Sequence, residues 1–198
     1  MVRILTVNNF GDKVGRKWLA LLRDSLKLDG VRAETVGWAE CSAGRFREYD
    51  GVVLSGSQAM ASQERTIRLF ASEIDAIRES STATLGICFG HQLLCHAFGS
   101  KVVRASKPTE KYVETEVLVD DPVFAGLPQT LSVFEAHHDV VDSVPRGFRL
   151  LARSPTCAVG AVKHKKLPVY GVQFHPERNS SRNPDGARII ANFVECLS

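Results

Sequence analysis

Residues 84–92 read Thr84-Leu85-Gly86-Ile87-Cys88-Phe89-Gly90-His91-Gln92, an apolar run of strand type that passes directly into a helical pattern. The helical pattern continues through Leu93 and Leu94 and ends at Gly99. Cys88 is therefore predicted to lie on a tight strand-to-helix turn, between two glycines that allow a close approach of the backbone. Such a nucleophile elbow exposes a thiol above the sheet, where the amides that begin the helix favour a thiolate.

The first half of the chain alternates strand and helix patterns. Strands are predicted at residues 3–7, 32–36, 51–54 and 84–87, and helices at residues 14–28 and 63–79. A βαβ series of this kind forms a mostly parallel sheet with helices on both faces. The sequence therefore predicts a three-layer α/β fold with its functional loops at the carboxyl ends of the strands.

Beyond Gly99 the pattern changes to shorter strands separated by turn residues. These strands are predicted at residues 101–104, 113–119, 130–134, 148–152, 158–163 and 169–174, and a last helix is predicted at residues 185–197. The sequence contains no internal repeat, low-complexity stretch or linker. We therefore expect one domain over residues 1–198, with both halves in one sheet.

The composition is that of an ordinary globular protein. Hydrophobic residues make up 44% of the 198, and 25 basic against 22 acidic residues give a net charge of +3, which does not indicate a nucleic-acid-binding surface. The cluster Lys163-His164-Lys165-Lys166 is predicted to form a solvated hairpin turn, with a docking patch for an acidic partner as the alternative. No apolar run reaches the roughly 18 residues of a membrane span, so we expect a cytoplasmic protein without membrane contacts.

The five cysteines indicate thiol chemistry rather than cross-linking. Their number is odd and they include no CxxC pair, which argues against a disulfide framework and against a thiolate zinc site. Cys95, Cys157 and Cys196 lack a glycine-flanked turn and are expected to be packing or near-surface thiols. A cysteine after a strand is by itself more often a core residue, but the glycines around Cys88 favour a nucleophile.

A nucleophilic thiol needs a base, and the base needs an orienting group. The segment Val169-Tyr170-Gly171-Val172-Gln173-Phe174-His175-Pro176-Glu177 supplies both at the end of another apolar strand. Pro176 keeps the backbone extended, so that the carboxylate of Glu177 reaches one imidazole nitrogen of His175 while the other nitrogen faces the thiol. His-Pro-Glu alone is a weak indication; with the elbow it predicts a catalytic triad of Cys88, His175 and Glu177.

The oxyanion of a tetrahedral intermediate requires hydrogen-bond donors. The sequence Leu54-Ser55-Gly56-Ser57 ends the predicted strand 51–54, which is expected to run beside strand 84–87. The main-chain amides of Gly56 and Phe89 are therefore the predicted oxyanion hole. Taken alone, Ser-Gly-Ser is more typical of a plain strand-to-helix turn, and that alternative stays open.

Together these residues resemble the class I (triad) glutamine amidotransferases, in which a Gly-x-Cys-x-Gly-x-Gln elbow and a Phe-His-Pro-Glu segment carry the catalytic Cys, His and Glu. The likeness covers nearly the whole chain and implies the flavodoxin-like fold of that family. It implies that Cys88 attacks the side-chain amide of glutamine, that His175 moves a proton to the leaving ammonia, and that Glu177 orients His175. It also implies that no cofactor takes part.

The same resemblance implies a set of substrate-binding residues. Gln92 would help to place glutamine, and the backbone around His137, His138 and Asp139 would contact its amino-acid head. Within the family, residues 123–128, 134–139, 150–154 and 167–177 are most similar to the glutamine-hydrolysing subunits of GMP synthase. Such a subunit delivers ammonia to a separate synthetase (ATP-pyrophosphatase) subunit.

Three stretches depart from the usual family pattern. The chain has Ser55-Gly56-Ser57-Gln58 where the family usually has Ser-Gly-Gly-Pro, and Arg178-Asn179-Ser180-Ser181 where it usually has Val-x-His-Thr after the glutamate. The opening residues 7–12 also differ from those of GMP synthase subunits. A different synthetase partner, of the anthranilate or aminodeoxychorismate type, therefore stays an alternative.

Other hypotheses concern a different class of function. A γ-glutamyl hydrolase that acts without a partner would use the same triad, whereas a non-enzymatic binding module would have no chemical reason to keep it. The histidines at positions 91, 96, 137, 138 and 175 raise the alternative of a metal site. Because no acidic residue is placed at ligand spacing, we expect no metal.

Overall fold

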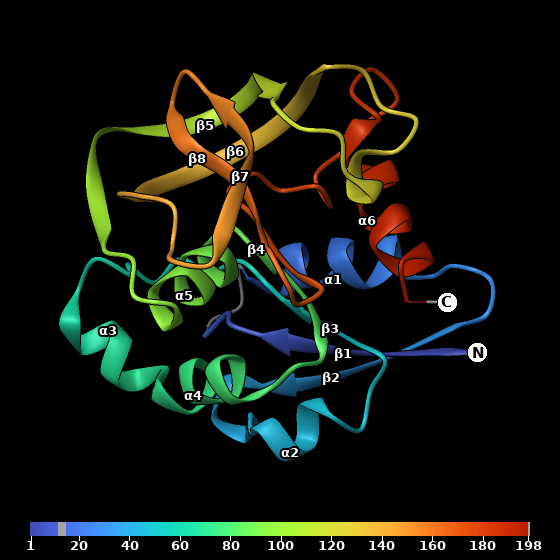
Figure 1. Ribbon diagram of the computed structural model, residues 1–198, viewed down its shortest axis with the longest axis vertical. Helices are drawn as coiled ribbons and strands as arrows, with labels where there is room; N and C mark the ends of the chain where they lie inside the picture. Colours follow the sequence, from blue (N-terminus) through green and yellow to red (C-terminus); the bar gives the residue numbers. More distant parts are fainter. Residues whose placement is uncertain (12–14, 198) are drawn as a thin grey trace.

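A single nine-stranded sheet forms the centre of the computed structural model, which describes residues 1–11 and 15–197 (Figure 1). The strand order is β2-β1-β3-β4-β9-β8-β7-β5-β6. The parallel part consists of β1 (Val2–Asn8), β2 (Val31–Gly37), β3 (Gly51–Leu54), β4 (Ala83–Ile87) and β9 (Val169–Val172). The antiparallel part consists of β5 (Val102–Val117), β6 (Thr130–Val141), β7 (Phe148–Ser154) and β8 (Cys157–His164).

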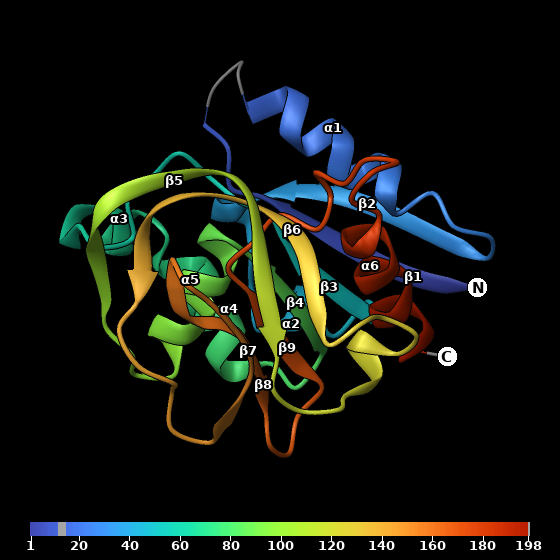
Figure 2. The ribbon, with the colours of Figure 1, turned by 90° about the horizontal axis from the view of Figure 1, so that it is seen from above.

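Helices cover both faces of the sheet (Figure 2). One face carries α1 (Gly15–Ser25) and α6 (Asp185–Glu195), and the other carries α2 (Ala43–Phe46), α3 (Glu64–Leu69), α4 (Ala71–Glu79) and α5 (Phe89–Ala97). Two short 3-10 turns, Trp38–Glu40 and Pro122–Phe124, complete the described elements. Each face encloses its own hydrophobic cluster, so the sheet has helices on both sides as the α/β prediction requires.

The central parallel strands place the carboxyl ends of β3, β4 and β9 side by side. All four residues of β3, all five of β4 and all four of β9 are buried, which is typical of parallel strands covered on both faces. Leu54 pairs with Gly86, and Ile87 pairs with Val172. The segments that follow these strands, including Cys88, therefore meet at one edge of the sheet.

Most predicted elements are confirmed within a few residues. The strands predicted at 3–7, 32–36, 51–54, 84–87, 148–152, 158–163 and 169–174 correspond to β1, β2, β3, β4, β7, β8 and β9, and the last helix corresponds to α6. The helix predicted at 14–28 is α1, except that residue 14 lies outside the described residues. The basic cluster at 163–166 lies in the hairpin between β8 and β9, but only Lys165 and Lys166 form its exposed turn. Lys163 is still in β8, and its Nζ pairs with the buried Asp121 at 2.9 Å, so the prediction of a solvated turn is wrong for this residue.

The single helix predicted at residues 63–79 is wrong, because two helices, α3 and α4, meet at Phe70. Phe70 has φ −95° and ψ 18°, outside the helical range. Its ring is 2% exposed and lies 4.9 Å from the ring centroid of Trp38 and 4.8 Å from that of Phe89. Burial between two aromatic rings therefore fixes Phe70 in a conformation that interrupts the helix.

The prediction of separate strands at residues 101–104 and 113–119 is also wrong, because β5 runs through both. Its pairing with β6 shifts register between Arg104 and Thr109, and Pro108 falls in that irregular stretch. A proline is tolerated at a bulge because no ladder hydrogen bond is required there.

The strand predicted at residues 130–134 is too short, since β6 continues to Val141. Alternate residues of β6 stay buried along its whole length, but the three buried positions between Val133 and Val141 are occupied by Glu135, His137 and Asp139. Polar residues therefore interrupt the hydrophobic alternation within the strand.

No helix of the described residues is long and apolar enough to span a membrane.

Candidate active site

Cys88 lies at the turn between β4 and α5 in a strained backbone conformation. Its φ of 50° makes it the one non-glycine residue with positive φ in the described part of the chain, and its ψ is −99°. Such a conformation costs on the order of 1–3 kcal/mol and persists where the surroundings enforce it. A Cβ on Gly86 would lie 2.7 Å from the Gly90 carbonyl oxygen, and one on Gly90 would lie 2.6 Å from that of Leu54. The glycines thus permit the close packing that holds the turn.

His175 and Glu177 follow the end of β9, the strand that pairs with β4. Nδ1 of His175 lies 2.7 Å from Oε1 of Glu177, and both side chains are 3% exposed. Burial lowers the pKa of His175, but Glu177 and Cys88 together outweigh it and raise the pKa to about 10. The imidazole is therefore protonated at neutral pH, and the nitrogen that Glu177 does not use is left for Cys88.

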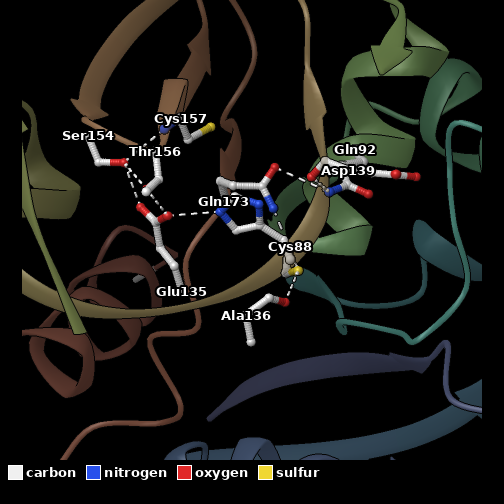
Figure 3. A network of polar contacts seen from close by, with 10 residues as sticks. Cys88, Gln92, Glu135, Ala136, Asp139, Ser154, Thr156, Cys157 and Gln173 are labelled. Atoms are coloured by element: carbon white, nitrogen blue, oxygen red, sulfur yellow. Dashed lines mark hydrogen bonds and ion pairs between the residues drawn. The ribbon is translucent and has the colours of Figure 1, made fainter. Parts of the chain in front are cut away.

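Polar groups from β6 and from the end of β9 surround the sulfur of Cys88 (Figure 3). Sγ lies 3.6 Å from the carbonyl oxygen of Ala136, and Nε2 of Gln173 donates to it at 3.6 Å. Cys88 is also close enough to His175 to raise the pKa of the imidazole. The structure therefore brings the three predicted triad residues together, in the order thiol, imidazole and carboxylate.

Cys88 and His175 line a cavity of about 420 Å³, a size typical of sites for small molecules. The other walls come from residues 57–60 after β3, residues 108–110 of β5, residues 136–139 of β6, and Trp18 of α1. A thiol and a protonated imidazole thus face a cavity that both polar and apolar side chains line.

Each predicted substrate-binding residue lines this cavity, although Gln92, His137 and Asp139 are also hydrogen-bonded within the protein. Gln92, His137, His138 and Asp139 all contribute to its walls. Nε2 of Gln92 donates to the Asp139 carbonyl oxygen at 2.7 Å, and a carboxylate oxygen of Asp139 accepts from the backbone N–H of Ser62 at 2.8 Å. Contact with a substrate stays a prediction for all four.

The two predicted oxyanion residues lie next to Cys88 and His175: Phe89 follows Cys88 in the chain, and Gly56 contacts the His175 ring. Phe89 is the first residue of α5, directly after Cys88, and it lines the cavity. Gly56 follows β3, and a Cβ there would lie 2.9 Å from Cε1 of His175, so only glycine leaves room for the imidazole ring. Both residues therefore lie beside the reacting groups, while their role as donors stays a prediction.

Comparisons with known proteins agree with this geometry. The model of the glutamine amidotransferase class-I family matches residues 14–196. The chain belongs to this family. By family it is therefore a glutamine-hydrolysing enzyme.

Relatives along the whole chain include a subunit of the glutamine-hydrolysing GMP synthase of Thermococcus kodakarensis, which is 37% identical over 193 residues and 97% of each chain. The corresponding protein of Methanocaldococcus jannaschii is 35% identical over 97% of this chain and 96% of its own. A crystal structure described as a GMP synthase subunit from Thermoplasma acidophilum superposes with a TM-score of 0.83 at 33% identity, covering 100% of this chain and 94% of that one. A glutamine amidotransferase structure from Thermotoga maritima, at 24% identity and a TM-score of 0.74 over 98% and 81% of the two chains, shares the fold.

The departure from the family pattern at Ser57 has a structural explanation. Oγ of Ser57 donates to the carbonyl oxygen of Asn9 at 2.7 Å and accepts from the backbone N–H of Ala59 at 3.1 Å. The backbone N–H of Asn9 in turn donates to Oγ of Ser55 at 2.9 Å. In this amidotransferase, side-chain hydrogen bonds thus fix the loop that carries Gly56, where the usual sequence relies on glycine and proline.

Glu135 is a buried carboxylate that sequence reasoning did not single out as part of the site. It accepts hydrogen bonds from Ser154 at 2.7 Å and from Thr156 at 2.5 Å, and it pairs with Nε2 of His137 at 2.8 Å (Figure 3). Burial acts to raise the pKa of Glu135, but these hydrogen bonds outweigh it and lower the pKa. The carboxylate therefore stays charged and fixes the ring of His137 at the cavity wall. Glu135 continues the alternation of buried positions along β6, but a hydrophobicity pattern does not reveal this because the residue is polar.

A second buried carboxyl group, that of Glu73 in α4, is connected to the Gly56 loop through Asn9. Glu73 is 0% exposed, and Nδ2 of Asn9 donates to its Oε1 at 3.1 Å. Nδ2 of Asn9 also donates to the Ser55 carbonyl oxygen at 3.1 Å. Burial raises the pKa of Glu73 to about 8, and the hydrogen bond from Asn9 offsets only part of that effect.

Glu73 is therefore expected to make the free energy of unfolding depend on pH. The folded protein keeps the Glu73 proton up to about pH 8, whereas the unfolded chain releases it near the ordinary glutamate pKa of 4.5. Stability from this group is thus fully present at low pH and is lost as pH rises toward 8. The glutamine side chain carries no charge at any pH, so Glu73→Gln lacks this loss. The free energy of unfolding of Glu73→Gln, relative to that of the wild type, should therefore increase by several kcal/mol between about pH 5 and about pH 9.

Urea unfolding of both proteins across this pH range measures the difference. The exposed residue Glu48 offers a matched control, since Glu48→Gln should leave the pH dependence unchanged. Parallel stability curves for wild type and Glu73→Gln would show that Glu73 is ionised in the folded protein.

No group of three or more His, Cys, Asp or Glu side chains is arranged as metal ligands within residues 1–11 and 15–197. Cys41, Cys95 and Cys157 are buried, and Cys196 is exposed.

Proposed function

We propose that this chain is the glutamine-hydrolysing subunit of a two-subunit GMP synthase and that it delivers ammonia to a separate ATP-pyrophosphatase subunit. The support is the similarity to GMP synthase subunits at 35–37% identity over 97% of the chain, joined to a Cys88 thiol beside the paired His175 and Glu177. L-glutamine is the proposed ammonia source.

In the proposed mechanism the His175 imidazolium and the Cys88 thiolate form the resting pair. The thiolate attacks the side-chain amide carbon of glutamine, and the negative charge moves onto the amide oxygen. The main-chain amides of Gly56 and Phe89 are proposed to donate to that oxygen, a contribution that is typically worth about 3 kcal/mol per donor. When the C–N bond breaks, His175 gives its proton to the leaving nitrogen, and ammonia and a γ-glutamyl thioester result.

The second half-reaction regenerates the enzyme. Neutral His175 takes a proton from water, and the resulting hydroxide attacks the thioester carbon. Glutamate leaves and the Cys88 thiolate is restored beside a protonated imidazole. Glu177 keeps the ring oriented and stabilises its positive charge in both halves. Gln92, His137, His138 and Asp139 are proposed to contact the substrate in the cavity.

The decisive experiment measures ammonia release from glutamine by the purified chain, alone and with an ATP-pyrophosphatase subunit of GMP synthase, ATP and xanthosine monophosphate. We expect the synthetase to stimulate hydrolysis and GMP to form. A mixture with ammonium salt in place of glutamine is the control, because it shows that the synthetase itself is active.

Two other outcomes would redirect the assignment. Hydrolysis without stimulation, in a mixture that makes GMP from ammonium, would point to another synthetase, such as anthranilate or aminodeoxychorismate synthase. Strong hydrolysis by the chain alone that extends to γ-glutamyl peptides would indicate a hydrolase that needs no partner.

A further inference from the structure

Arg178 follows the proposed triad directly and lies in the wall of the cavity. Its backbone is fixed on both sides: the N–H donates to the His175 carbonyl oxygen at 3.1 Å, and the carbonyl oxygen accepts from the Tyr112 hydroxyl at 2.9 Å. The usual family residue at this position is an uncharged valine. A cation at the cavity is therefore a feature of this chain rather than of the common family pattern.

The guanidinium group of Arg178 is stacked on aromatic rings. Its Cζ lies 3.5 Å from the ring centroid of Trp18 and 5.4 Å from that of Phe134. Stacking occupies the faces of a guanidinium and leaves its N–H groups in the plane available as a fork for a carboxylate. Among the described residues, no carboxylate forms an ion pair with Arg178, and its buried Nε has no hydrogen-bond partner.

The charge of this group is poorly solvated. Burial lowers the pKa of Arg178, although the guanidinium remains charged because its ordinary pKa is so high. The charges of Glu177, Cys88 and Glu110 raise the pKa of Arg178, so the guanidinium is close enough to Cys88 to interact with it electrostatically. A desolvated cation with unused donors gains most from an anionic ligand.

We propose that Arg178 binds the α-carboxylate of glutamine and selects free amino-acid substrates in this cavity. In glutamine the α-carboxylate and the reacting amide carbon are separated only by the α-carbon and two methylene groups. Cys88 and Arg178 line the same cavity, so glutamine bound at the thiol presents its α-carboxylate within that cavity. Glu110 lines the same cavity and supplies a negative charge for the α-ammonium group. This inference rests on the proposed glutaminase site, but not on the identity of the synthetase.

The test compares two electrophiles that alkylate Cys88. The glutamine analogue 6-diazo-5-oxo-L-norleucine carries an α-carboxylate and an α-ammonium group, whereas iodoacetamide carries neither. Rates of labelling at Cys88 are followed by intact-protein and peptide mass spectrometry. In Arg178→Met we expect labelling by the analogue to slow by about 10- to 100-fold, the range for loss of a hydrogen bond to a charged group. Labelling by iodoacetamide should change little.

Two further variants sharpen the result. Arg178→Lys keeps the charge but loses the planar fork, so we expect an intermediate rate with the analogue. Arg182→Met is the matched control, since Arg182 is an exposed arginine in the same segment and does not line the cavity. It should label like the wild type with both reagents.

Each contrary outcome has a distinct meaning. Equal slowing of both reagents in Arg178→Met would overturn the inference, because Arg178 would then act through the thiol. Unchanged labelling by both reagents would also overturn it. A wild-type Cys88 that reacts with iodoacetamide but not with the glutamine analogue would instead reject the glutaminase site itself. If the chain made no GMP with the synthetase, the ratio of the labelling rates with the two reagents would still test the role of Arg178, because it does not depend on the synthetase.

Discussion

Cys88→Ala is expected to lower the rate of glutamine hydrolysis by about 10⁶-fold, to the background of the assay, because it removes the group that forms the thioester. The fold should persist, since the substitution deletes one sulfur atom whose neighbours are the Ala136 carbonyl oxygen and Gln173. Ammonia release measures the activity, and thermal unfolding measures the stability.

Two variants make this result specific. Cys196→Ala removes an exposed thiol and should leave activity unchanged. Cys88→Gly should be as inactive as Cys88→Ala but more stable by about 1 kcal/mol or more, because glycine adopts φ 50° without strain. Retained hydrolysis in purified Cys88→Ala would reject the thiol mechanism.

Strand and helix patterns were sufficient to predict the parallel half of the sheet. β3, β4 and β9 are short apolar runs, and the sequence places Cys88, Gly56 and His175 just after their ends. Parallel strands bring their carboxyl ends to one edge, so the three segments had to converge once the sheet was predicted. The convergence of these residues was predictable from sequence for this reason.

The antiparallel half was less predictable because its buried positions are not hydrophobic. Glu135, His137 and Asp139 alternate on the buried face of β6, where a hydrophobicity pattern shows nothing. Phe70 likewise ends α3 through contacts with Trp38 and Phe89, which lie far from it in sequence. Such tertiary contacts override local propensity.

Residues that support the site from a distance were missed for the same reason. Glu73 is 64 residues from Asn9, and Trp18 is far in sequence from Arg178. Neither pair forms a motif. A charged residue at a position that is usually valine was the one available signal for Arg178, and a glutamate on the buried face of α4 was the signal for Glu73.

His175→Ala is expected to lower the rate of glutamine hydrolysis almost as much as Cys88→Ala, by about 10⁵-fold or more, because the residues of a triad act as a unit. The double variant Cys88→Ala/His175→Ala should be no less active than Cys88→Ala alone. Glu177→Gln keeps the shape of the side chain but not the charge that raises the pKa of His175, and a loss of about 10⁴-fold is expected.

Alkylation of Cys88 by iodoacetamide separates the role of His175 in activating the thiol from its role in proton transfer. Without the imidazolium, Cys88 loses the neighbouring cation that stabilises a thiolate, so His175→Ala should slow alkylation. His164→Asn, in the hairpin between β8 and β9, is the control and should alkylate like the wild type. If His175→Ala alkylated at the wild-type rate yet failed to release ammonia, proton transfer to the leaving group would be the sole function of His175. If it kept full activity, the pairing with Glu177 at 2.7 Å would be structural only, and another base would have to serve Cys88.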